Sequence, residues 1–153
     1  MRKIQAAAAL LVLILAWALP STASATPPTH DRSSDEFDVD FGDELCGFDL
    51  LAHVEQTVTL TTFYDKAGNP KRAVLTGPIT VWFTNADTGG TVRLSISGPS
   101  FFDADGTLIR GAGTWAVFTP EGDFVWAAGH LVFDENGNVF EIRGRAVNVC
   151  DLL

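Results

Sequence analysis

Residues Asn85–Ser97 read NADTGGTVRLSIS and combine a turn with a β-strand. Val92, Leu94 and Ile96 are apolar, whereas the residues between them are polar. A period of two places the two kinds of side chain on opposite faces of a strand. The Asn, Asp and Gly residues before the strand suit a tight connection. This stretch therefore predicts a strand with one buried face, joined by a short turn to an antiparallel neighbour.

The same pattern of strand-like runs separated by turn residues continues from Cys46 to the end of the chain, with no helical period over ten residues. We expect an all-β fold, an antiparallel up-and-down meander of seven or eight strands. Because open sheets expose their edges, we expect the meander to close as a barrel, with a β-sandwich as the alternative. The expected strands are residues 48–64, 71–76, 78–84, 91–97, 107–110, 113–119, 124–133 and 139–149.

Residues 1–25 have the three parts of a secretory signal peptide. Arg2 and Lys3 precede an uncharged apolar run over residues 6–19, and Ala23-Ser24-Ala25 forms a small-residue cleavage motif. The run is shorter than the roughly 20 residues that span a bilayer. The pattern predicts cleavage after residue 25 and a secreted, extracellular protein with no transmembrane anchor.

Residues 26–44 hold seven of the acidic residues and few apolar ones, so we expect a disordered acidic leader ahead of a single β domain at 45–153. Without Arg2 and Lys3, 8 basic residues remain against all 19 acidic ones, a formal charge of −11 for the mature chain. This charge argues against nucleic acid as a partner. The oligomeric state is left open.

Cys46 and Cys150 are the two cysteines, and they bracket the predicted domain. In an oxidising compartment an even number of cysteines indicates pairing, so we predict a disulfide. In a closed barrel this bond would join the first and last strands.

The candidates for acid–base chemistry are His53, Glu55 and His130. We favour a solvent-exposed face for His53 and Glu55, and a rim or hydrogen-bonded position for His130. With three histidines and no CxxC motif, the sequence predicts no metal site and no cofactor. The Asp-rich segments starting at Asp103 and Asp134 resemble the opening of a calcium loop but are interpreted as hairpin turns.

Five aromatic residues are candidates for lining an apolar cavity: Trp82, Trp115, Trp126, Phe133 and Phe140. Small residues in the last two strands would leave room beside them, although large and small side chains can also interlock. The first hypothesis is a secreted, non-catalytic barrel that binds a small apolar ligand or a surface component. The alternatives are an isomerase or cyclase with a histidine at the barrel mouth, and a structural or interaction module with a filled core.

Three segments carry a resemblance to small, uncharacterised secreted proteins of actinobacteria. They are GPITV at 77–81, TNADTGGTVRLSISGP at 84–99 and GRAVNVC at 144–150, within a likeness that spans about 45–150. The resemblance implies export and a β-barrel-like fold, and it carries no activity. The architecture is also similar to that of calycin, allene-oxide-cyclase and dirigent barrels, but a fold does not supply a function.

Overall fold

The computed structural model describes residues 26–153, which form nine β-strands and one short 3-10 helix. The predicted all-β class is confirmed. The predicted signal peptide at 1–25 lies outside the described residues. The elements are β1 (Thr29–Asp40), β2 (Leu50–Tyr64), β3 (Pro70–Thr76), β4 (Ile79–Asn85), β5 (Thr91–Ser95), β6 (Ser100–Phe102), β7 (Leu108–Phe118), β8 (Phe124–Phe133), β9 (Val139–Asn148) and η1 (Cys150–Leu152).

The strands form one antiparallel sheet that follows the chain as a meander. On one edge of β2, residues 59–64 pair with β3 and residues 50–56 pair with β4. β3 and β4 each pair with one further strand: β3 pairs with β6, and β4 pairs with β5. β7, β8 and β9 then follow in order. The expected strands at 107–110 and 113–119 are one strand, β7, and the short β6 was not expected.

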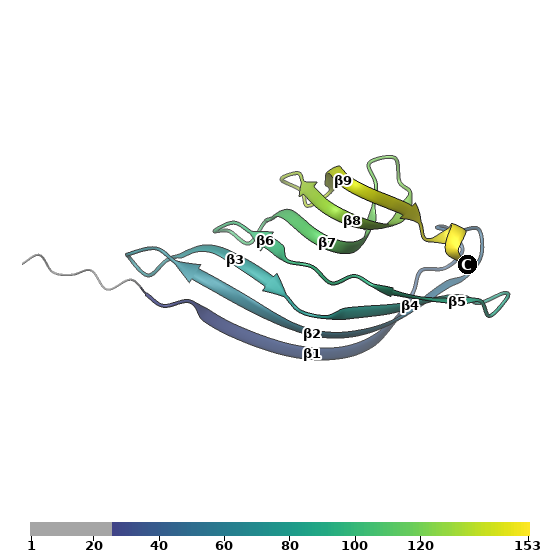
Figure 1. Cartoon of the computed structure of the whole chain (residues 1–153), viewed down its shortest axis with the longest axis horizontal. Coiled ribbons are helices and arrows are strands. Elements are labelled where there is room, and N and C mark those ends of the chain that lie inside the picture. The colour runs from purple at the N-terminus through teal and green to yellow at the C-terminus, as the bar shows by residue number, and fades with distance from the viewer. Residues whose placement is uncertain (1–25) are drawn as a thin grey trace, which may run out of the picture.

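The sheet is not closed as a barrel, so this part of the expectation is wrong. Among residues 26–153, β1 pairs only with β2 and β9 only with β8, which leaves both at sheet edges. Instead, β7–β9 lie above β1–β5 (Figure 1). One part of the sheet thus packs face to face on another, and its edge strands do not pair with each other. The arrangement fits the sandwich alternative, because apolar side chains of both layers fill the space between them.

The main core lies between these two layers. Leu50 and Phe83 from the first layer pack with Phe124 and Val149 from the second. The Phe83 and Phe124 rings meet edge to face, with centroids 5.5 Å apart. A second cluster of Leu131, Phe133 and Val139 lies within β8 and β9, where side chains of β7 pack against it. Apolar surface is therefore buried between the two layers and also within the layer of β7–β9.

A row of glycines crosses the sheet where it bends. It consists of Gly77, Gly98, Gly113, Gly129 and Gly144. Gly129 pairs with Gly113 on one side and with Gly144 on the other, and Gly98 lies against Gly113. A Cβ at any of the five would come into steric conflict with neighbouring backbone, which belongs to an adjacent strand or, for Gly113, to the segment between β5 and β6. The row therefore permits close approach of neighbouring backbones and a sharp bend of the sheet.

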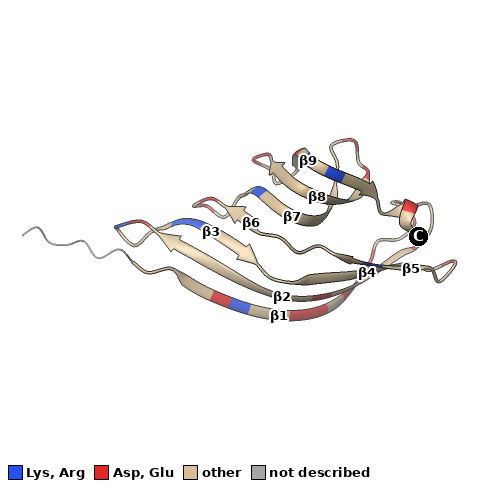
Figure 2. Ribbon diagram, in the orientation of Figure 1, with Lys and Arg blue, Asp and Glu red and all other residues tan. Residues whose placement is uncertain are grey.

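The segment expected to be a disordered leader is ordered over most of its length, which corrects that prediction. β1 pairs with β2 residue for residue, from Thr29 opposite Thr62 to Asp40 opposite Leu51. Composition argued for disorder because the segment cannot bury enough apolar surface by itself. The free edge of β2 supplies the missing hydrogen bonds, and Val39 packs against the main core. Its acidic residues lie along the edge strand (Figure 2), where charge discourages further strand addition.

Four hairpin turns share one construction, in which an Asp or Thr side chain accepts a hydrogen bond from the backbone and a glycine follows three residues later. In the last of them, Asp134 Oδ1 accepts hydrogen bonds from the N–H groups of Asn136 and Asn138, both at 2.9 Å. The Asn138 N–H in particular holds the pKa of Asp134 below its usual range. Asp103 caps its turn in the same manner. The turns are residues 65–69, 103–107, 119–123 and 134–138.

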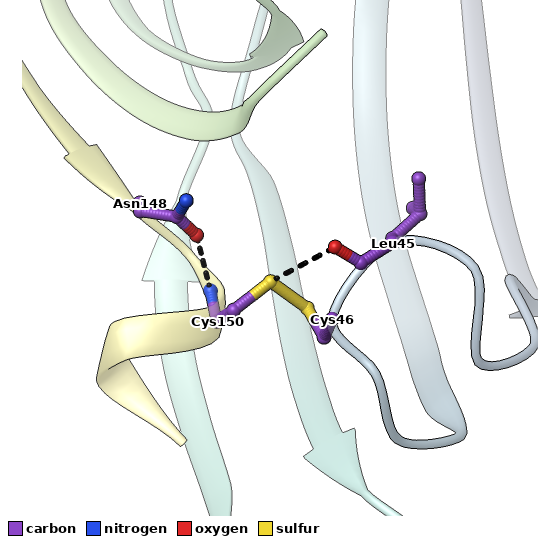
Figure 3. The surroundings of a disulfide bond; sticks show 4 residues. All are labelled: Leu45, Cys46, Asn148 and Cys150. Carbon is purple, nitrogen blue, oxygen red and sulfur yellow. Dashed lines mark hydrogen bonds between the residues drawn. A yellow bond between two sulfur atoms is a disulfide. The ribbon is translucent and has the colours of Figure 1, made fainter.

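The predicted disulfide between Cys46 and Cys150 is confirmed, with the two Cα atoms 5.3 Å apart. It joins the loop between β1 and β2 to η1, immediately after β9 (Figure 3). Beside it, the Cys150 N–H donates to Asn148 Oδ1 at 2.9 Å. The bond thus links the loop before β2 to the segment after β9, although β2 and β9 do not pair with each other. Within residues 26–153, no helix has the length and apolar character needed to cross a membrane.

Candidate functional site

An apolar cavity of about 250 Å³ lies at the bend of the sheet. Its walls come from five strands and from the segments that join them, far apart in the sequence. The lining residues are Val58, Leu75, Thr76, Gly77, Ile79, Ile96, Gly98, Ser100, Trp115 and Ala116. Two of them, Gly77 and Gly98, belong to the glycine row, so the bend and the cavity have a common structural origin.

Trp115 forms the aromatic wall of the cavity and is held in place by its own strand. Its Nε1 donates a hydrogen bond to the carbonyl oxygen of Ala112 at 3.1 Å. Its ring lies against Gly111, where a Cβ would come into steric conflict with the indole. Phe133 of the second cluster packs on the indole from β8, with ring centroids 5.5 Å apart. These contacts limit the orientations that the indole can adopt.

The chemistry of the lining is that of a binding site for an uncharged molecule. Most of the surface is aliphatic, glycine or indole. The side-chain polar groups of the lining residues are the hydroxyls of Thr76 and Ser100 and the indole N–H of Trp115, which already donates to Ala112. The set of lining residues includes no Asp, Glu, His, Lys or Arg. Burial of apolar ligand surface is the favourable contribution that such walls supply.

Of the five aromatic candidates, Trp115 lines this cavity. Trp82 lies on the opposite, outer face of the sheet, where the Arg93 guanidinium stacks over it at 5.4 Å. Trp126 donates a hydrogen bond to the Ser95 carbonyl oxygen at 2.9 Å and packs against the main core.

Phe133 and Phe140 line a second, more open hollow of about 600 Å³ between the hairpin ends of β7–β9. Phe140 is 71 % exposed, the highest value among the exposed large apolar residues of the described chain. The sequence suggested these aromatic residues as one group. The structure keeps Trp115 and Phe133 in contact and places Trp82, Trp126 and Phe140 elsewhere.

The residues that sequence reasoning missed are the aliphatic ones, such as Val58, Ile79 and Ile96. Strand alternation places each of them on an inner face, so a signal for burial was present. Their convergence on one cavity depends on the bend of the sheet, for which alternation alone contains no information.

The acid–base candidates lie elsewhere. His53 is on the outer face of β2, where its Nδ1 is 2.8 Å from Asp38 Oδ1 and its Nε2 is 3.6 Å from Glu36 and 3.8 Å from Glu55. The hydrogen bond with Asp38 raises the pKa of His53, and the neighbouring carboxylates act in the same direction. Two of these three partners come from β1, the segment expected to be disordered.

His130 is exposed on β8, opposite Ala112 and Arg143. Neither histidine nor Glu55 lines the apolar cavity. Over residues 26–153, no group of three or more His, Cys, Asp or Glu side chains is arranged to hold a metal ion.

In comparisons with protein-family models, with curated proteins and with solved structures, no match to this chain is found. The resemblance to small secreted actinobacterial proteins is untouched by these comparisons and stays a prediction.

Proposed function

We propose that this protein is an exported, non-catalytic binding module that holds a small apolar ligand at the bend of its sheet. The observation that carries the proposal is the cavity of about 250 Å³ between Val58, Leu75, Ile79, Ile96 and Trp115. Small-ligand sites are typically concave, mostly apolar and supplied with few polar groups, which is the character of this lining.

Binding without chemistry is the simplest function for these walls. Acid–base catalysis needs a titratable group within hydrogen-bond reach of the reacting atom. The lining residues provide hydroxyl groups and no titratable side chain. His53 and its carboxylate neighbours lie on the outer face of the sheet instead.

Export is supported by the signal-like pattern of residues 1–25 and by the Cys46–Cys150 bond, which suits an oxidising compartment. Intact-mass analysis of protein recovered from the growth medium tests this part. We expect a mature chain that begins at Thr26 and carries one disulfide. A full-length, cell-retained chain would contradict export.

Ligand binding is tested by titrating the purified protein with naphthalene while the tryptophan fluorescence is followed. Filling the cavity with Ala116→Leu or Ile96→Phe should weaken binding at least tenfold. The matched control is Ala104→Leu in the turn before β7, an exposed position outside the cavity. Circular dichroism and thermal unfolding identify a variant that fails to fold. Absence of saturable binding to the wild-type protein would overturn the proposal.

A further inference from the structure

We propose that the ligand of this cavity is a neutral molecule with one hydroxyl or carbonyl oxygen, which Ser100 Oγ holds by a hydrogen bond. The inference rests on the proposed function and adds the chemical class of the ligand. It is carried by the position of one buried hydroxyl group in a mostly apolar wall, whose other hydroxyl belongs to the exposed residue Thr76.

Ser100 is one of two polar residues in the buried part of the described chain, and it is only 7 % exposed. It begins β6, opposite Leu75 of β3 on one side and Gly111 of β7 on the other. The other buried polar residue, Asn85, accepts hydrogen bonds from the N–H groups of Asp87 and Thr88. These hydrogen bonds compensate the burial of the Asn85 side chain.

The hydroxyl of Ser100 has no such compensation. Among residues 26–153, no protein group forms a hydrogen bond with its Oγ, whereas nearby Ser97 Oγ bonds to both the N–H and the carbonyl oxygen of Ile79. Across the same residues, no side-chain N or O atom is both fully enclosed and without a partner. The unpartnered Oγ of Ser100 is therefore not fully enclosed, and because Ser100 lines the cavity we infer that its Oγ is accessible from that space. A hydroxyl both donates and accepts, so it can serve a ligand hydroxyl or carbonyl group.

The size and charge of the cavity narrow the ligand further. At the packing density of protein interiors, about 0.74, a space of 250 Å³ accommodates roughly ten non-hydrogen atoms. The lining has no cationic side chain to pair with a carboxylate or phosphate. An anionic ligand would lose its hydration without compensation, and so would a cationic one, because the lining has no Asp or Glu either. We therefore infer an uncharged ligand.

Three probes that share one aromatic ring system test the hydrogen bond and the charge of the ligand: naphthalene, 2-naphthol and 2-naphthoate at pH 7. A single hydrogen bond predicts that 2-naphthol binds about threefold to tenfold more tightly than naphthalene. We expect 2-naphthoate to bind more weakly than either. Ser100→Ala should remove the preference for 2-naphthol and leave naphthalene binding within twofold of the wild type. Ser33→Ala, at an exposed position on β1 away from the cavity, is the matched control and should change neither value.

The outcomes distinguish this inference from the proposed function. If naphthalene binds but 2-naphthol binds no better, or if Ser100→Ala keeps the preference, the assignment of Ser100 is wrong while the cavity remains a binding site. Tighter binding of 2-naphthoate overturns the neutral class. Failure of every probe overturns the proposed function itself. Even if Ser100→Ala does not fold, a wild-type protein that shows no preference for 2-naphthol over naphthalene is enough to overturn the inference.

Discussion

The indole of Trp115 lies against the backbone of Gly111, four residues earlier in the same strand. Gly111 is buried by this contact, and the indole Nε1 donates to the carbonyl oxygen of Ala112 between them. The absence of a side chain at position 111 therefore allows the orientation of Trp115 that forms one wall of the cavity. Glycine here provides space for a neighbouring ring.

Replacing Gly111 with alanine should displace the indole of Trp115 and weaken naphthalene binding. We expect a loss of about 1–3 kcal/mol in the free energy of unfolding, the usual cost of adding a methyl group to a packed site. Urea denaturation measures the loss, and a shift of tryptophan emission reports the displacement. In a Trp115→Val background the same change should cost much less, because the indole is absent. An equal cost in both backgrounds would contradict the contact.

A second prediction concerns the glycine row. Gly129→Ala should destabilise the protein by about 4 kcal/mol or more, because the new Cβ would come into steric conflict with the Arg143 carbonyl oxygen and close on Gly144. Gly137→Ala, in a turn with open space around it, is the control. Its positive φ alone should cost about 1–2 kcal/mol. Similar losses at both positions in urea denaturation would argue against a close-packed bend.

Loss of the disulfide should lower stability without abolishing the fold. The bond joins residues 104 apart in the sequence, so its removal in Cys46→Ala/Cys150→Ala should cost about 2–5 kcal/mol. Guanidinium unfolding of the wild-type protein with a reductant should reproduce the loss. The double variant should be insensitive to the reductant, and a reductant effect of equal size on it would point to another cause.

The pH dependence of His53 follows from its hydrogen bond with Asp38. We expect NMR titration to give a pKa above the ordinary 6.5, and Asp38→Asn should lower it. Asp40→Asn, further along β1 and opposite Leu51, should have little effect. A pKa at or below 6.5 in the wild-type protein would show that β1 does not hold its carboxylates beside His53.

The raised pKa of His53 links its protonation to the stability of the fold. Because folding raises the pKa of His53, the protonated form stabilises the folded state. This contribution is complete below the unfolded pKa near 6.5 and is lost as the pH rises through the folded value. The difference in unfolding free energy between wild type and His53→Gln should therefore shrink across that window, and a constant difference would contradict the linkage.

Much of the fold could be predicted because its signals are local. The alternation at Val92 and Leu94 is confirmed by β5, and the turn residues at 134–138 are confirmed by the hairpin between β8 and β9. β1 could not be predicted in this way. Its acidic composition indicates disorder, but the hydrogen bonds that order it come from the edge of β2.

The cavity depended even more on tertiary structure. Among the aromatic candidates for a ligand site, Trp115 reaches the cavity, while Trp82 lies on the outer face and Phe140 near a separate hollow. The alternation of apolar and polar residues predicts on which face of its strand each residue lies, but it does not predict which faces of the sheet pack together.

The sequence by itself determined the class of the fold, the order of most strands, their turns and the pairing of Cys46 with Cys150. Each of these depends on residue types close together in the chain or on a cysteine count. Tertiary structure decided that the sheet folds over in place of closing, that β1 joins it, and that Ser100 and Trp115 share one cavity. The physical reason is that Gly98, Gly113, Gly129 and Gly144 let neighbouring backbones come into contact, and the resulting bend selects which inner faces meet.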